Sequence, residues 1–172
     1  MIRSYADDER RVLAYIRHIG PLHLKDPVLP DLLKKQLVQS QITRRSRVTF
    51  DLNARARRLM GYRTKPSSPR HLERRFGFRR LLEEWHQTHR LTRLDSKLPM
   101  YGAGSQRYWL VYWASPPRSE TLRATQQRAQ AQGAVLVASW PEAEGLEREG
   151  LAIVPEAALS LYPPLSLELI AG

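Results

Sequence analysis

Arginine is the residue type whose number and spacing in this chain most directly suggest a chemistry, the binding of phosphate groups. Residues 43–94 hold 15 Lys and Arg against 4 Asp and Glu, whereas the stretches before and after carry net charges of +2 and −2. Fourteen of these fifteen cations are arginine, whose rigid fork of donors fits phosphate oxygens and guanine edges. A basic block between near-neutral flanks predicts a surface for a polyanion, and favours nucleic acid over an anionic membrane.

Histidine and acidic residues give weaker signals for metal or hydrolytic chemistry. His86 and His89 are spaced as on one helix face with Glu83 a turn earlier, but His89 falls on the apolar arc beside Trp85, so we expect it to pack there and predict no metal site. The run Asp95-Ser-Lys97 resembles a trace of a nuclease centre but lacks partner carboxylates on the following strand.

Motifs for cofactors and nucleophiles are missing from the sequence. The glycines of Gly102-Ala-Gly104 lack the Lys-Ser/Thr ending of a phosphate-binding loop, and no Gly-x-Ser-x-Gly elbow occurs. The chain has no cysteine, which excludes disulfides, thiolate zinc sites and a cysteine nucleophile. We therefore predict no cofactor and no catalytic activity.

Length and hydropathy place the chain among ordinary folded proteins. Its 172 residues suit one large or two small domains, and 42% hydrophobic residues permit a core. No apolar run approaches the 18 residues of a membrane span, and the first residues do not resemble a signal peptide. We expect a soluble cytoplasmic protein.

Helices are predicted for most of the first 90 residues. One runs from Ser4 or Asp7 to about Ile19, and a short one begins at Pro30 or Asp31. A third is predicted over residues 44–60, with an apolar stripe beside a row of guanidinium groups that would hold flanking phosphates. That row consists of Arg44, Arg47, Arg55 and Arg58.

The segment 68–90 predicts two helices rather than one. Ser68 and Pro69 are a strong helix start, and Leu72 and Phe76 share a face, but the apolar phase shifts at Gly77. The run SPRHLERRFGF, residues 68–78, resembles the first helix and turn of bacterial helix-turn-helix domains. Glu73 and Glu83 stand where that pattern usually has a small and an aliphatic residue. The resemblance implies a recognition helix over residues 79–90, with Arg79, Arg80, Glu83 and Gln87 nearest the bases.

The remaining chain alternates strands and helices. Strands are predicted at 91–98 and 107–113 around a glycine turn at 101–105, as in the wing of a winged helix. The strand at 107–113 could equally begin a parallel sheet, because a helix at 119–132, a strand at 134–139, a helix at 141–149 and a strand at 151–154 follow it. Residues 159–170 suggest an edge strand.

Aromatic residues near this strand have two interpretations. Tyr101, Tyr108, Trp109, Tyr112 and Trp113 could stack on bases, but alternation sends apolar groups to both faces of the strand, which favours burial on both sides.

The sequence therefore predicts an α+β fold, with a mainly helical basic region over 1–106, winged-helix-like and containing a helix-turn-helix, and a small α/β unit over 107–172 that would dimerise or hold a protein partner. The predicted function is non-catalytic binding of double-stranded DNA in transcription regulation or in replication or mobile-element transactions. The predicted contacts are Arg44, Arg47, Arg55, Arg58, Arg70, Arg74, Arg75, Arg79, Arg80, Gln87, Arg90 and Arg93. An RNA-binding subunit, a nuclease-like enzyme using Asp95 and Lys97, and an adaptor for an acidic protein remain the alternatives.

Overall fold

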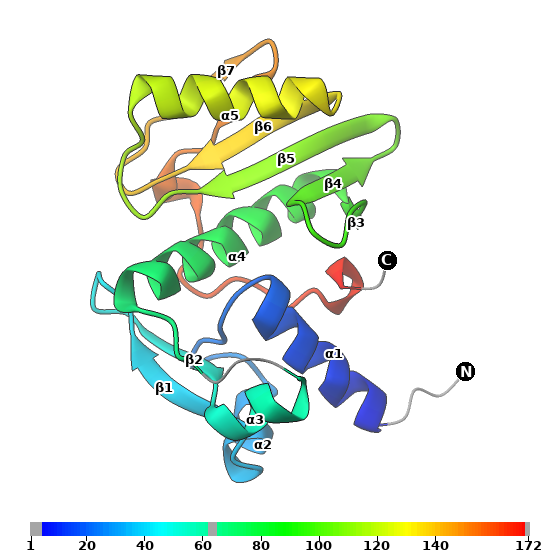
Figure 1. The fold of residues 1–172 in the computed structure, drawn as a ribbon, viewed down its shortest axis with the longest axis vertical. Coiled ribbons are helices and arrows are strands. Elements are labelled where there is room, and N and C mark those ends of the chain that lie inside the picture. Colours follow the sequence, from blue (N-terminus) through cyan, green and yellow to red (C-terminus); the bar gives the residue numbers. More distant parts are fainter. Residues whose placement is uncertain (1–4, 62–64, 171–172) are drawn as a thin grey trace.

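A long helix, α4, lies between a six-stranded sheet and a smaller layer of helices and a hairpin (Figure 1). The computed structural model describes residues 5–61 and 65–170, and its fold is mixed α+β. The helices are α1 Tyr5–His18, α2 Leu29–Lys34, α3 Ala54–Leu59, α4 Pro69–His89 and α5 Ser119–Ala131. The strands are β1 Val38–Ile42, β2 Val48–Leu52, β3 Thr92–Arg93, β4 Met100–Ala103, β5 Gln106–Tyr112, β6 Ala134–Ser139, β7 Leu146–Arg148 and β8 Leu151–Ile153, with short 3-10 turns η1 Glu156–Ala158 and η2 Leu167–Leu169.

The large sheet has the strand order β3-β4-β5-β6-β8-β7. Strand β5 pairs antiparallel with β4 on one side and parallel with β6 on the other, so it belongs to both a hairpin and a parallel unit. Helix α5 makes the crossover between β5 and β6 and covers one face of the sheet, while α4 covers the other (Figure 1). The sheet therefore contains strands from both sides of residue 107, where the sequence suggested a division.

Side chains of β5 alternate between the two faces as the sequence predicted. Leu110 and Tyr112 are buried in the core under α4, whereas Trp109 and Trp113 pack on the core under α5. The strands predicted at 107–113, 134–139 and 151–154 and the helix predicted at 119–132 are confirmed with shifts of one residue at most.

Several predictions for the second half of the chain are wrong. Residues 141–149 contain strand β7 instead of a helix, and residues 159–170 form an irregular tail with the turn η2 instead of an edge strand. Only residues 92–93 of the strand predicted at 91–98 are extended. Residues 101–103 belong to β4, so the hairpin turn is confined to Gly104 and Ser105, and Gly104 has a φ of +61°.

Residues 44–60 are mostly a β-hairpin and not the predicted helix. Strands β1 and β2 pair antiparallel from Val38 opposite Leu52 to Ile42 opposite Val48, and Leu22 adds a bridge to Phe50. Only Ala54–Leu59 is helical, and Asn53 caps it by accepting a hydrogen bond from the Ala56 N–H at 2.9 Å. The predicted row of guanidinium groups is consequently split between the hairpin turn and α3.

Helix α4 runs without interruption from Pro69 to His89, so the prediction of two helices joined at Gly77 is wrong. Its start is as predicted, because the Ser68 hydroxyl accepts from the His71 N–H at 3.2 Å. Gly77 serves close packing instead of a turn, since a Cβ at that position would lie 2.1 Å from the ring of Tyr112. The apolar phase shifts because α4 is buried by the sheet on one side and by α1 and the tail on another.

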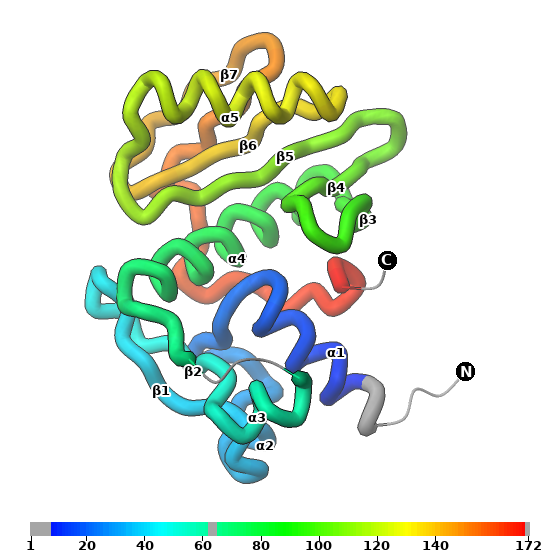
Figure 2. The backbone as a smooth tube through the Cα atoms, viewed as in Figure 1, coloured from blue at the N-terminus to red at the C-terminus, as the bar shows by residue number. Residues whose placement is uncertain are grey.

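The C-terminal tail passes under α4 and ends beside α1, so that three segments distant in sequence meet there (Figure 2). One core, which includes Tyr15, Leu81 and Leu110, joins α1, α4, the sheet and the tail. A second lies among α1, α2 and the hairpin. Within residues 5–61 and 65–170, every helix is too short or too polar to cross a membrane.

Candidate nucleic-acid interface

Arg79 and Arg80, which the sequence placed in a recognition helix, are buried structural residues. Arg79 makes a bidentate ion pair with Asp26 at 2.7 and 2.8 Å and donates to the backbone carbonyls of Pro21, Pro163 and Pro164. Its side chain is 0% exposed, so the prediction that it reads bases is wrong.

Arg80 holds the C-terminal tail in the same way. Its Nε donates to the Ser160 carbonyl at 2.9 Å and one terminal nitrogen donates to the Leu159 carbonyl at 3.0 Å. Glu83 faces the same tail and accepts from the Ser166 N–H and hydroxyl and from the Tyr15 hydroxyl. Glu83 is buried as well, which removes it from any base-reading surface and explains why α4 carries charge on a face turned inward.

Three further arginines that were predicted to contact DNA make contacts within the protein. Arg75 pairs with buried Asp51 at 2.7 Å. Arg47 lies 3.7 Å from Glu156, which also pairs with Arg45. Arg93 donates to the backbone carbonyls of residues 95 and 96 and so fixes the loop between β3 and β4.

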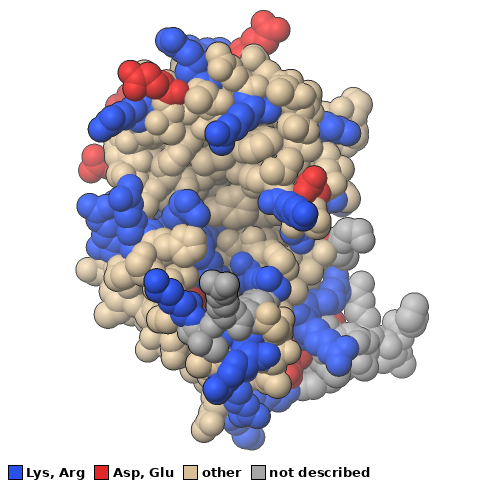
Figure 3. All heavy atoms as spheres, in the orientation of Figure 1, with Lys and Arg blue, Asp and Glu red and all other residues tan. Residues whose placement is uncertain are grey.

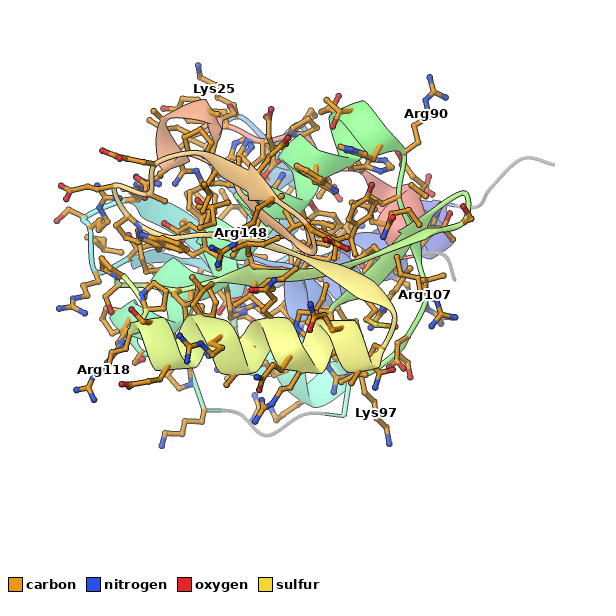
Figure 4. All side chains as sticks on the ribbon, turned by 90° about the horizontal axis from the view of Figure 1, so that it is seen from above. Lys25, Arg90, Lys97, Arg107, Arg118 and Arg148 are labelled. Atoms are coloured by element: carbon orange, nitrogen blue, oxygen red, sulfur yellow. The ribbon has the colours of Figure 1, made fainter. Side chains whose placement is uncertain are left out.

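The other predicted residues are exposed but do not share one face. They are Arg44, Arg55, Arg58, Arg70, Arg74, Gln87 and Arg90. Arg70 and Arg74 lie on the first two turns of α4, whereas Arg90 caps its far end. Arg90 points to the opposite side of the molecule from Lys97 (Figure 4). No single face of the fold therefore presents all of the predicted residues.

A cleft gathers part of the basic block together with cations from elsewhere in the sequence. It has a volume of about 410 Å³ and lies between the end of α1, the first half of α4, the β3–β4 loop and the end of β5. We call it the cationic cleft, and its charged or titratable lining side chains, apart from tyrosine, are Arg17, His18, His71, Arg74, Arg75, Arg93 and Lys97. Among the described residues that line it, none is Asp or Glu.

The floor of the cationic cleft is apolar. Ile19, Tyr101 and Leu110 form it and are almost completely buried, and the half-buried residues Phe78 and Trp113 also line the cleft. Burial raises the pKa of Tyr101 to about 12, so this phenol stays neutral throughout the physiological range. The cleft thus combines cationic walls with a neutral, partly aromatic base.

A smaller side pocket continues the cationic cleft toward the start of α4. Its volume is about 260 Å³, and it shares His71, Arg74 and Trp113 with the larger one. Arg70 and the serine side chains of Ser68 and Ser115 complete the polar part of its lining. Figure 3 shows this face hollowed below the sheet, with Lys and Arg gathered around the hollow.

The two histidines report the electrostatics of the cleft. Burial, followed by the charges of Arg93 and Arg17, lowers the pKa of His18. Burial, followed by Arg74 and Arg75, lowers the pKa of His71, with Asp51 acting in the opposite direction. Both imidazoles are therefore neutral near pH 7, and the arginines around them create a field that attracts anions.

Sequence reasoning missed Arg17, His18 and Lys97 as partners of the α4 arginines. Arg17 and His18 occupy the last turn of α1, where basic residues are common at a helix C-terminus, so they gave no separate signal. Lys97 was considered only as part of the Asp95-Ser-Lys97 run, which resembles part of a nuclease centre. Packing of α1 and the β3–β4 loop against α4 brings all three to one cleft.

Metal and nuclease chemistry receive no support from the geometry. The carboxylate of Asp95 accepts from the Lys97 and Leu98 N–H groups at 2.7 and 2.9 Å, and these bonds lower its pKa. Within residues 5–61 and 65–170, no group of three or more His, Cys, Asp or Glu is placed to hold a metal ion. Asp95 instead shapes the loop that presents Lys97 to the cleft.

Comparison of the chain with protein-family models, with curated proteins and with solved structures finds no match.

Proposed function

We propose that this protein is a non-catalytic DNA-binding protein and that the cationic cleft contacts the phosphate backbone. The observation that carries the proposal is the lining of the cleft, in which cations from α4, β3 and the β3–β4 loop converge on one hollow. Within the described residues, Arg75 alone of the α4 pair Arg74 and Arg75 has an ion pair, with Asp51 from outside the lining. Convergence of like charge costs free energy through mutual repulsion, and an anionic ligand relieves that cost.

The basic surface extends beyond the cleft, which favours a polymeric ligand over a small anion. Arg70 lies in the side pocket, and the hairpin turn carrying Arg44 joins the start of α4 through a hydrogen bond from the Arg44 N–H to the Pro69 carbonyl at 3.2 Å. Cations therefore follow one another from the hairpin along α4 to Lys97. A sugar-phosphate backbone supplies anions along such a path.

The proposal is tested by measuring binding of fluorescein-labelled DNA by anisotropy at several salt concentrations. The variant R74A/K97A removes one arginine and one lysine from the cleft. The control R90A/K25A removes the same charges from the opposite side of the molecule, as Figure 4 shows. The two variants have equal net charge, so a difference between them reports position alone.

The cleft variant should bind more weakly and lose up to about 1.8 from the slope of log K against log salt, since each phosphate contact contributes about 0.9 on duplex DNA. The control should retain the wild-type slope. Equal losses in both variants would place the interface outside the cleft. A preference for structured RNA of matched length would favour the RNA-binding alternative, and no affinity for either at low salt would favour an acidic protein partner.

A further inference from the structure

The lining of the cationic cleft is apolar as well as charged. Ile19 and Leu110 are 2% and 1% exposed, and Tyr101 is 3% exposed, so the floor is the outer layer of the main core. Charged walls above such a floor suit a ligand with an anionic edge and a flat apolar part. A nucleotide has both.

Trp113 is the side chain best placed to meet a base. It is half-buried at the end of β5 and lines both the cationic cleft and the side pocket. Trp140 supports it from outside both cavities, with ring centroids 6.1 Å apart and an interplanar angle of 57°. Tyr101 and Tyr112 are 3% and 2% exposed, and Phe78, which is half-buried like Trp113, lines only the larger cavity. Trp113 lines both cavities.

The dimensions of the cleft favour one nucleotide over a duplex. A volume of about 410 Å³ is near the lower limit of the range for small-ligand sites, about 300–1,000 Å³. A duplex keeps its bases stacked and paired, so it would present phosphates to the rim and leave the floor empty. An unpaired nucleotide can place its base on the floor, while the side pocket beyond Trp113 continues the path of cations for the adjoining phosphate.

We propose that the cationic cleft receives one unpaired nucleotide of a DNA single strand, with its base against Trp113 and the apolar floor and its phosphates against Arg74 and Lys97. This inference rests on the proposed function and narrows the form of DNA that the site selects. Stacking of a base on an aromatic side chain corresponds to about 5- to 150-fold in affinity. The site therefore prefers single-stranded DNA to duplex DNA of equal length.

The first test uses the unmodified protein and three DNA probes in an anisotropy assay: a ten-residue thymidine strand, the same backbone with abasic sites, and a ten-base-pair duplex. The thymidine strand should bind about 5- to 150-fold more tightly than the abasic strand, although both carry the same phosphates. Equal binding of these two strands would overturn base insertion and leave phosphate binding intact. Binding of neither strand nor duplex at low salt would overturn the proposed function as well.

The second test uses variants of two tryptophans of the same strand. W113A should reduce affinity for the thymidine strand toward that for the abasic strand, with no change for the abasic strand itself. W113F should retain most of the preference because an aromatic ring remains. W109A, the matched control, should keep the wild-type preference, since Trp109 is also half-buried on β5 but is not among the residues that line either cavity. A loss in W109A equal to that in W113A would refute direct stacking on Trp113, and tighter binding of a uridine RNA strand would refute the assignment to DNA.

Discussion

Replacement of Arg79 by alanine separates a structural role from a DNA contact. The substitution removes five hydrogen bonds and leaves Asp26, with a side chain 2% exposed, as a buried carboxylate without its main counter-charge. Breaking a buried ion pair on one side costs about 3–5 kcal/mol. For a chain of this size we expect Tm to fall by about 6–20 °C.

The assay is thermal and urea denaturation followed by circular dichroism, with R74A as the matched control. Arg74 lies on the same helix but is exposed, so R74A should change the free energy of unfolding by no more than about 0.5 kcal/mol. The double variant R79M/D26L leaves no charge buried at this site. Its loss in free energy of unfolding should be smaller than the summed losses of R79M and D26L by about 0.5–3 kcal/mol.

Binding measured at a temperature where R79A is folded completes the experiment. R79A should retain wild-type affinity for DNA, while R74A should lose affinity and retain stability. Wild-type Tm in R79A combined with lost affinity would refute our assignment of Arg79 to the fold and restore it as a DNA contact.

Two further changes give predictions of known sign. G77A should lower the free energy of unfolding by about 1–3 kcal/mol, because the added Cβ would lie 2.1 Å from the Tyr112 ring. The measurement is Tm, and an unchanged Tm would show that α4 can shift freely on the sheet. DNA binding should take up protons and tighten as pH falls from about 7 toward 5, because a bound phosphate raises the lowered pKa values of His18 and His71. Calorimetry in buffers of different ionisation enthalpy measures this proton uptake. The variant H18Q/H71Q should abolish it.

Local sequence patterns were sufficient to predict the strands in the parallel part of the sheet. Residues 134–139 form a continuous apolar run behind Gly133, which has a φ of +67° and ends α5. Such a run predicts a buried strand, which pairs with β5 before it in the chain and with β8, which follows after the short strand β7. The same reasoning identified β5 and the alternation of its faces.

The hairpin at residues 38–52 was not predictable by the same means. The apolar residues Val48, Leu52 and Ala56 fit a helical stripe, but Val48, Phe50 and Leu52 also alternate as in a strand. Pairing with β1 and the bridge from Leu22 to Phe50 decide between these patterns, and both depend on contacts across the chain. The predicted row of arginines depended on the helical pattern, so it was wrong for the same reason.

Burial of charge in α4 is the other feature that the sequence concealed. Arginines and glutamates on a helix normally mark its exposed face, but Arg79, Arg80 and Glu83 form hydrogen bonds with Asp26 and with polar groups of the tail. Those partners lie 53, 80 and 83 residues away in sequence, so no local pattern reveals them. The basic block was correctly located in the chain, but about half of its cations on α4 serve the fold, and Arg17 and Lys97 complete the cleft from outside it.

The most direct test of the central claim is hydrogen exchange with and without bound DNA, read by mass spectrometry. Ligand in the cationic cleft should slow exchange in the β3–β4 loop, residues 94–99, and in residues 113–118 beside the side pocket. The turn at residues 23–27, on the opposite side of the molecule, should exchange at its unliganded rate. Protection at residues 23–27 or at the far end of α4, with none in the β3–β4 loop, would contradict the assignment of the interface.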